Sequence, residues 1–252
     1  MFEQTLANFL KDKDFLRNDL FRIPAIRDAV TLDRYQNLFH SQITKSHSDA
    51  SSKVTIAHNT DVERMFFTEL SRRPDLISNV LSSLNSVRQN ASHMRVLSIG
   101  SRTEAELFSL VNAGFSLQHI ECVDLFSYTP HIKVGDIHHL EYSEGFFDIV
   151  VCGWVLEFCN DIPQACAEIK RVTKKSGMIC IGGMHHPSSV NMENYNKRKK
   201  HEDRVWYCSI EAIKTFFNVT EDQWILKSGI EPSDLDKRGE VLAIFKNERS
   251  DV

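Results

Sequence analysis

The first 93 residues carry their apolar side chains at the spacing of amphipathic helices. The pattern predicts helices over residues 61–70 and, after Pro74, over residues 76–87, because a proline suits the first turn of a helix. A serine-rich polar segment, residues 41–52, lacks this periodicity and is predicted to be a loop. We therefore expect residues 1–93 to form a helical N-terminal extension that caps the rest of the chain.

From residue 94 onward, short apolar runs alternate with helical patterns. Four runs are rich in strand-forming residues: RVLSIG, HIECVDLF, FFDIVVCGWV and GMICIGG. One helical pattern between them ends at Gly114, and another, CAEIKRVTKKSG, ends at Gly177. Strands that alternate with helices predict a doubly wound α/β fold, with a mostly parallel sheet covered on both faces.

The end of the chain has a different pattern. A short helix, SIEAIKTFF, precedes two strand-like runs, DQWILKSGI and GEVLAIFK, and the polar link between these runs has no helical periodicity. Two strands joined in this way are predicted to pair antiparallel. Residues 94–252 are therefore predicted to form one core, with an insert at about residues 185–209. All ten glycines of the chain lie between Gly100 and Gly239, so we expect the tight turns and ligand contacts in this core.

Composition narrows the class of protein. The 252 residues carry a formal net charge of −4, which gives no general attraction to nucleic acid. No run approaches the roughly 20 apolar residues that span a bilayer, so neither a nucleic-acid nor a membrane partner is expected. The six cysteines form no CxxC pair, and the N-terminus lacks the pattern of a signal peptide. These features predict free buried thiols and a cytoplasmic protein.

Candidate ligand-binding residues lie near the ends of the predicted strands, where ligands bind in an open parallel sheet. Residues 99–104 form a strand-to-helix turn, and the N–H groups of such a turn favour a negative group. Asp124 closes the next strand 24 residues after Gly100, and a carboxylate there can accept two hydrogen bonds from the vicinal hydroxyls of a ribose. Two further candidates are Asp136, just before the third core strand, and Gly153, at the end of that strand.

The order and spacing of these runs resemble those of class I S-adenosylmethionine-dependent methyltransferases of the small-molecule type. The resemblance is carried by VLSIGSRTEAE, VDLF, GDIHHLEYSEGFFDIVVCGWVLEF and EIKRVTKKSGMICIGG, which span about residues 94–183. It implies a mostly parallel seven-stranded sheet with an antiparallel C-terminal strand pair, and it implies S-adenosylmethionine as the cofactor.

The resemblance also assigns ten residues to the cofactor site. They are Gly100, Ser101, Arg102 and Thr103 for the methionine part, Asp124 and Leu125 for the ribose, Asp136 and Ile137 for the adenine, and Gly153 and Trp154 for the sulfonium.

The chain departs from the family pattern in the glycine loop and after the fourth motif. Ser98 stands where the loop usually has an acid, and Arg102 stands where it usually has a glycine. Two interpretations stay open: the cofactor site is lost, or Arg102 binds the cofactor carboxylate through its forked guanidinium. The retained ribose and adenine carboxylates favour the second. Phe158 stands where many relatives have a histidine, so a general base is missing there.

Two other histidines are candidates for catalysis. His185 and His186 follow the glycines of the fourth strand, and a general base there would lie at the mouth of the site. No histidine or cysteine group has the spacing of a metal site, so no metal is expected.

The sequence therefore predicts methyl transfer from S-adenosylmethionine to oxygen or nitrogen of a small-molecule or saccharide-like acceptor. Three alternatives stay open: a catalytically inactive binding protein on the same fold, an NAD-dependent oxidoreductase and an RNA methyltransferase. The degenerate glycine loop favours the first, and the missing GxGxxG loop speaks against the second. The third rests only on the basic run at residues 196–204. The sequence does not indicate an oligomeric state.

Overall fold

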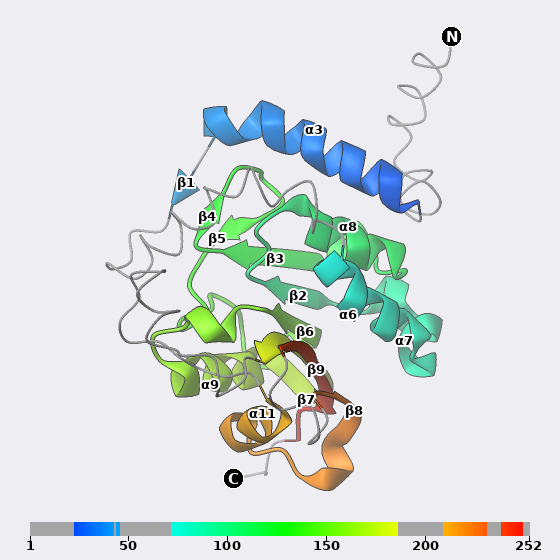
Figure 1. Ribbon diagram of the computed structural model, residues 1–252, viewed down its shortest axis with the longest axis vertical. Coiled ribbons are helices and arrows are strands. Elements are labelled where there is room, and N and C mark those ends of the chain that lie inside the picture. Colours follow the sequence, from blue (N-terminus) through cyan, green and yellow to red (C-terminus); the bar gives the residue numbers. More distant parts are fainter. Residues whose placement is uncertain (1–22, 43, 46–71, 186–208, 231–237, 249–252) are drawn as a thin grey trace. The chain divides into compact units, whose positions relative to one another are not determined.

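The computed structural model describes residues 23–42, 44–45, 72–185, 209–230 and 238–248 (Figure 1). The chain divides into two compact units, Met1–Asp136 and Ile137–Val252. Strands and helices alternate through both units.

The first unit contains three parallel strands in the order β5-β3-β2. They are β5 (Lys133–Val134), β3 (Ile120–Asp124) and β2 (Val96–Ile99). Every residue of β2 is buried, as expected for an apolar strand covered on both faces. Because the three strands are parallel, they all end at the same edge of the sheet. A separate antiparallel pair joins β1 (Thr44–Lys45) to β4 (Phe126–Ser127).

One carboxylate joins three helices of the first unit. The helices are α3 (Pro24–Gln42), α6 (Arg72–Ser83) and α8 (Glu104–Asn112). Nη2 of Arg27 in α3 lies 2.8 and 2.7 Å from the two carboxylate oxygens of Asp75 in α6, and Ser109 of α8 donates to the same carboxylate at 2.7 Å. Short helical segments complete the unit: α7 (Asn85–Asn90), η3 (Ala91–His93) and η4 (Leu117–His119).

The second unit contains four strands in the order β6-β7-β9-β8. They are β6 (Phe147–Gly153), β7 (Thr173–His185), β8 (Trp224–Ser228) and β9 (Gly239–Lys246). β6 and β7 are parallel, whereas β9 pairs antiparallel with both β7 and β8. The helical segments are α9 (Ile162–Val172), α11 (Ile210–Phe217), η5 (Leu156–Phe158) and η6 (Glu221–Gln223).

The predicted fold class is confirmed, because seven strands form a mixed sheet with parallel strands and an antiparallel C-terminal pair. Two local predictions in the first unit are wrong. The helix predicted over residues 76–87 is interrupted at Leu84, which has an extended backbone between α6 and α7. The loop predicted over residues 41–52 contains the end of α3 and the short strand β1, whose partner β4 lies far along the chain. The predicted helix at residues 61–70 lies outside the described residues.

The helix predicted to end at Gly177 in fact ends at Val172. Thr173 pairs with Phe147 across the β6–β7 ladder, and the Asn247 side chain donates to the carbonyl oxygen of Thr173 at 2.9 Å. Basic residues are typical of a helix end, but here the strand pairing and the Asn247 hydrogen bond extend the backbone after Val172. None of the described helices is long and apolar enough to cross a membrane.

Candidate functional site

A tight turn connects β2 to α8. Gly100 has a φ of 75°, a backbone conformation that glycine adopts without strain. Its N–H donates to the carbonyl oxygen of Val123 at 2.7 Å, and the Arg102 N–H donates to the Gly100 carbonyl oxygen at 2.8 Å. A single glycine is therefore sufficient to turn the chain here, and the turn is bonded to the end of β3.

Ser98, which stands in place of the expected acid, is hydrogen-bonded to Ser101 within this turn. Ser101 is fully buried, and its hydroxyl lies 3.1 Å from the Ser98 carbonyl oxygen and 2.8 Å from the Ser98 hydroxyl. The Ser101 N–H donates to Val123 at 3.3 Å. Ser101 thus lies in the predicted loop, with its hydroxyl bonded to Ser98 and its N–H bonded to the end of β3.

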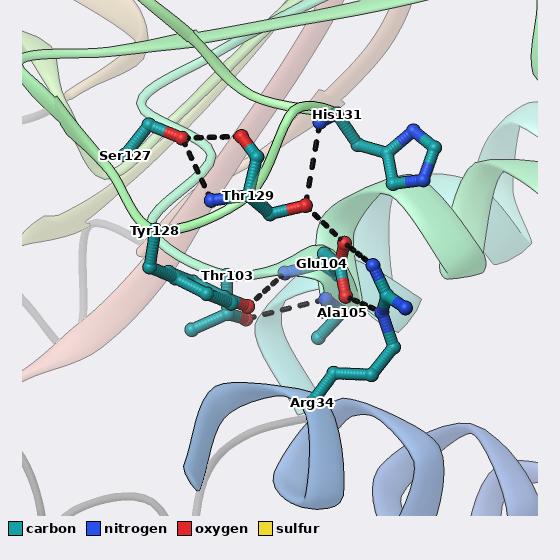
Figure 2. Close-up of polar contacts among 8 residues, drawn as sticks. All are labelled: Arg34, Thr103, Glu104, Ala105, Ser127, Tyr128, Thr129 and His131. Atoms are coloured by element: carbon teal, nitrogen blue, oxygen red, sulfur yellow. Dashed lines mark hydrogen bonds and ion pairs between the residues drawn. The ribbon is translucent and has the colours of Figure 1, made fainter. Parts of the chain in front are cut away.

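The first turn of α8 is capped by side chains of the chain itself. Thr103 is the N-cap residue, and its Oγ1 accepts a hydrogen bond from the Ala105 N–H at 3.2 Å. The Thr103 N–H donates to Oε2 of Glu106 at 3.3 Å. The Glu104 N–H donates to the Tyr128 hydroxyl at 3.0 Å (Figure 2). Three N–H groups that a helix start could offer to an anion are therefore already bonded.

A buried carboxylate ties α3 to the same turn. Glu104 is fully buried, and its two oxygens face the fork of Arg34, with Nε at 2.5 Å and Nη2 at 2.9 Å. Thr129 also donates to Glu104, at 2.5 Å. Figure 2 shows Arg34 reaching from α3 to this carboxylate. The Tyr35 ring packs edge-on against Tyr128, with centroids 5.1 Å apart. α3 therefore fixes the residue that begins α8.

Asp124, the predicted ribose residue, ends β3 and is only 8% exposed. Its Oδ1 accepts a hydrogen bond from the Phe126 N–H at 3.3 Å, and its carbonyl oxygen accepts one from the Gly135 N–H at 2.8 Å. Burial raises the pKa of Asp124 to about 7, the Glu106 carboxylate also raises it, and the Arg102 charge lowers it. At neutral pH this carboxyl is close to half ionised, so a ligand that donates hydrogen bonds to it would favour the carboxylate form.

Arg102 lies near two carboxyl groups, those of the buried Asp124 and the half-buried Glu106. Its charge lowers the pKa of both Asp124 and Glu106. The Nε–H of Arg102 is buried, and none of the described residues accepts a hydrogen bond from it. A ligand with an anionic group for Arg102 and a diol for Asp124 would satisfy both side chains. The carboxylate and ribose of S-adenosylmethionine are such groups, so these residues fit the implied cofactor.

A short strand that the periodicity did not predict positions Asp136. β5 is two residues long, and Asp136 follows it by two residues, half-buried. A Cβ atom at Gly135 would lie 2.7 Å from Cγ2 of Val123, so the glycine allows the turn after β5 to approach β3 closely. Leu125, the predicted neighbour of the ribose, is half-buried next to Asp124.

We expect Gly135→Ala to lower the free energy of unfolding by about 1–3 kcal/mol, as overpacking does in a tight site. The added methyl group would collide with Val123, a β-branched side chain with little freedom to rotate. Urea unfolding measures the loss. Val123→Ala removes the colliding Cγ2, so the Gly135→Ala cost should shrink in that background. An equal cost in both backgrounds would rule out this collision as the cause.

The other predicted site residues lie in the second unit. Ile137 is buried at its start. Gly153 ends β6 opposite Gly182, and Trp154 donates its N–H to the Gly182 carbonyl oxygen at 2.7 Å. Trp154 is buried and has a φ of 57°, which is uncommon for a bulky residue and indicates a tightly held turn. His185 is the last residue of β7 and is half-buried.

Some sequence predictions fall outside the described part of the chain. His186 and the insert after it, up to residue 208, are among these. Within the described ranges, no group of three or more histidine, cysteine, aspartate or glutamate residues could hold a metal ion. The described cysteines are all buried, and none of them forms a disulfide: Cys122, Cys152, Cys159, Cys166 and Cys180.

Two features of the site were missed from the sequence. Glu106 was detectable, because Thr103 and Glu106 have the Thr-x-x-Glu spacing of a capping box. The pairing of Arg34 with Glu104 was not detectable, because the two residues are 70 positions apart.

Comparisons with known proteins identify a methyltransferase pattern. A family model described as a methyltransferase domain matches residues 109–181. The matched segment contains Asp124, Asp136 and Gly153 and begins after the Gly100 turn, where the chain departs from the family pattern. A curated relative, the malonyl-[acyl-carrier protein] O-methyltransferase of Serratia marcescens, is 37% identical over 49 residues, which are 19% of this chain and 19% of the relative.

Solved structures resemble this chain at low sequence identity. One is a chain from the complex between the Trm112 methyltransferase activator of Haloferax volcanii and a protein described as a methyltransferase. It has 12% identity and a TM-score of 0.51, and the match covers 81% of this chain and 100% of that chain. Another is the N-methyltransferase NodS of Bradyrhizobium japonicum in complex with S-adenosyl-L-homocysteine, with 14% identity, a TM-score of 0.42 and coverage of 70% and 100%.

The match of residues 109–181 to a methyltransferase domain confirms the family resemblance predicted from the sequence. The chain spans about a fifth of the curated relative that it matches, so this match does not show which reaction the whole protein catalyses.

Proposed function

We propose that this chain, which carries a class I S-adenosylmethionine-dependent methyltransferase domain, transfers the methyl group to oxygen or nitrogen of a small-molecule or saccharide-like acceptor. The observation that carries the proposal is the convergence of three predicted cofactor positions at one sheet edge. Gly100 is bonded to Val123 at the end of β3, and Gly135 is bonded to Asp124 at the same end. The residues predicted for the methionine, ribose and adenine thus lie in neighbouring turns of the first unit, which supports the proposal.

Each carboxylate has a distinct task in this proposal. Asp124 accepts the two ribose hydroxyls, with Leu125 beside it. Asp136 accepts the exocyclic amine of adenine, and Ile137 packs against the ring. The Gly100–Thr103 loop binds the methionine part, and Gly153 and Trp154 line the path of the sulfonium. These roles follow from the order of the motifs and from the strand ends at which the residues lie.

When bound, the cofactor supplies a methyl group that its sulfonium makes electrophilic. The protein then has to align the acceptor with that methyl group and exclude water. Such effects need shape more than a specific base, so a phenylalanine at position 158 is compatible with catalysis. Where an acceptor proton must leave, we propose His185 or His186 as the general base. The helical residues 1–93 and the insert at about 185–209 are proposed to select the acceptor.

The structure also bears on the alternatives. A nicotinamide cofactor would place its pyrophosphate on free N–H groups at a helix start, but the N–H groups of Thr103, Glu104 and Ala105 are engaged by side chains. This observation disfavours the oxidoreductase. A catalytically inactive binding protein shares the cofactor site and differs only in turnover. An RNA methyltransferase would depend on the basic run at residues 196–204, outside the described residues. The buried thiols of the described residues support a cytoplasmic location.

Calorimetric titration with S-adenosylhomocysteine, S-adenosylmethionine and NAD tests the binding part of the proposal. We expect both sulfur ligands to bind and NAD not to bind. Because the pKa of Asp124 is about 7 and the ribose requires its carboxylate, affinity should increase about tenfold between pH 6 and pH 8, with proton release at the lower pH. Absence of heat with both sulfur ligands would contradict the proposal. Transfer of tritium from methyl-labelled cofactor to pools of small molecules then separates an enzyme from an inactive relative.

A further inference from the structure

The segment around the end of β3 carries Asp124, and backbone hydrogen bonds attach its start to the Gly100 turn. The N–H groups of Gly100 and Ser101 both donate to the carbonyl oxygen of Val123, at 2.7 and 3.3 Å. Val123 directly precedes Asp124 in the chain. The two turns that are proposed to bind the cofactor are therefore joined on this side, next to the Asp124 backbone.

A second attachment joins the other end of this segment to the first residue of α8. Tyr128 is fully buried, and its hydroxyl oxygen accepts a hydrogen bond from the Glu104 N–H at 3.0 Å. Thr129, the next residue, donates its hydroxyl to Oε1 of Glu104 at 2.5 Å. Figure 2 shows both hydrogen bonds meeting at Glu104. Asp124 thus lies between two attachments to the segment that contains the Gly100 turn and the start of α8.

The two hydroxyl groups determine geometry rather than fill space. The ring of Tyr128 packs edge-on against Tyr35, with centroids 5.1 Å apart, and this contact does not involve the hydroxyl group. Hydrogen bonds have narrow ranges of distance and angle, and burying a hydroxyl group is costly unless it is bonded. The hydroxyls of Tyr128 and Thr129 therefore hold residues 124–129 at one position relative to the start of α8.

Both partners of these hydrogen bonds are themselves held in place. The carboxylate of Glu104 is paired with the Arg34 guanidinium of α3, at 2.5 Å for Nε and 2.9 Å for Nη2. On the other side, the Asp124 carbonyl oxygen accepts a hydrogen bond from the Gly135 N–H at 2.8 Å, and β4 pairs with β1. The spacing between the Gly100 turn and Asp124 therefore depends on the bonds that Tyr128 and Thr129 make to Glu104.

We propose that Tyr128 and Thr129 are positioning residues, whose hydrogen bonds to Glu104 set the spacing between the Gly100 turn and Asp124 that the cofactor requires. The inference rests on the proposed function and assigns no ligand contact to either residue. A ligand that spans both turns gains from the correct spacing, because its second end then binds without further ordering of the protein. A ligand that occupies only the Asp124 end gains little from it.

The test compares two ligands that differ in the part of the site they span. S-adenosylhomocysteine carries the amino acid, and 5′-methylthioadenosine keeps the adenosyl thioether without it. Both are titrated calorimetrically into the full chain at pH 8.5. We expect Tyr128→Phe to weaken S-adenosylhomocysteine about tenfold and methylthioadenosine less than about twofold.

A matched pair of substitutions at position 129 tests the second hydrogen bond. Thr129→Val keeps the shape of the side chain and removes the hydroxyl, so it should weaken S-adenosylhomocysteine about three- to tenfold and methylthioadenosine less than about twofold. Thr129→Ser keeps the hydroxyl and should retain the wild-type ratio of the two affinities. If Tyr128→Phe does not fold, this pair decides: equal affinity ratios for Thr129→Val and Thr129→Ser would overturn the inference.

A further control separates a loss of stability from a loss of positioning. Val87→Ala shortens a fully buried side chain of α7. It should lower the melting temperature but leave the ratio of the two affinities unchanged. Thermal denaturation of every variant verifies that it is folded at the temperature of the titration.

The outcomes distinguish the inference from the proposed function. Equal weakening of both ligands by Tyr128→Phe, or weakening of neither, would overturn the inference and leave the proposed function standing. A change of the affinity ratio in Val87→Ala as large as that in Tyr128→Phe would also overturn it. A wild-type chain that binds neither S-adenosylmethionine nor S-adenosylhomocysteine would overturn both.

Discussion

Replacing Asp124 by asparagine is expected to stabilise the folded chain at pH 8 while weakening S-adenosylhomocysteine about 30- to 100-fold. Asparagine keeps the shape and can still accept the hydrogen bond from Phe126. It lacks the charge that strengthens the two ribose hydrogen bonds, and this explains the loss of affinity. A substitution that raises the free energy of unfolding but lowers ligand affinity is expected where a residue is retained for its ligand.

The sign of the stability change follows from the raised pKa of Asp124. The pKa is about 7 in the folded chain and about 4 in an unfolded one, so between these pH values only the folded chain holds the proton. Stability therefore decreases as pH rises from 4 to 7, by up to about 4 kcal/mol. Because the asparagine amide also needs partners, we expect a gain of about 1–3 kcal/mol at pH 8 and little gain at pH 5.

Chemical unfolding of wild type and Asp124→Asn at pH 5 and pH 8, with titration of S-adenosylhomocysteine at pH 8, measures both effects. Asp33→Asn is the matched control, because Asp33 is an exposed carboxylate of α3. It should change neither quantity. A destabilised Asp124→Asn chain at pH 8, or one with wild-type affinity, would contradict the role given to Asp124.

Arg34→Met is expected to lower the free energy of unfolding by about 2–4 kcal/mol. It leaves the fully buried Glu104 carboxylate without its cation, and breaking a buried pair costs about 3–5 kcal/mol. The Arg34 side chain is 34% exposed, so screening by water reduces this cost. Affinity for S-adenosylhomocysteine should also decrease, because Glu104 begins the helix that follows the cofactor loop.

A double-mutant cycle isolates the pair. Glu104→Gln removes the buried charge and keeps an oxygen for Thr129, so Arg34→Met should cost much less in that background. Denaturant unfolding of the four chains gives the coupling energy. Additive effects of the two substitutions would show that the ion pair does not hold α3 to this turn.

Local patterns predicted those parts of the site that local chemistry determines. The run VLSIG predicted the strand and the turn at Gly100, and the carboxylate after an apolar run predicted Asp124 at the end of β3. β5 was missed because a two-residue strand is too short to show periodicity. Its existence depends on pairing with β3 and on Gly135, whose missing side chain permits the close approach.

Other features depend on partners that are distant in the sequence. The basic residues after Val172 are typical of a helix end, but pairing of Thr173 with Phe147 extends this segment into β7. Likewise, nothing near Glu104 in the sequence indicates that its counter-ion is Arg34. The positive φ of Trp154 is a further case, because tryptophan does not favour that conformation and no sequence pattern predicts it.

A crystal structure of the full chain with S-adenosylhomocysteine tests most directly whether the strand ends of the first unit form the cofactor site. The expected result places the ribose hydroxyls within hydrogen-bond distance of the Asp124 carboxylate, the adenine beside Asp136, and the amino-acid carboxylate on Arg102. Ligand density away from the Gly100 turn and Asp124, or crystals that take up no ligand at saturating concentration, would contradict it.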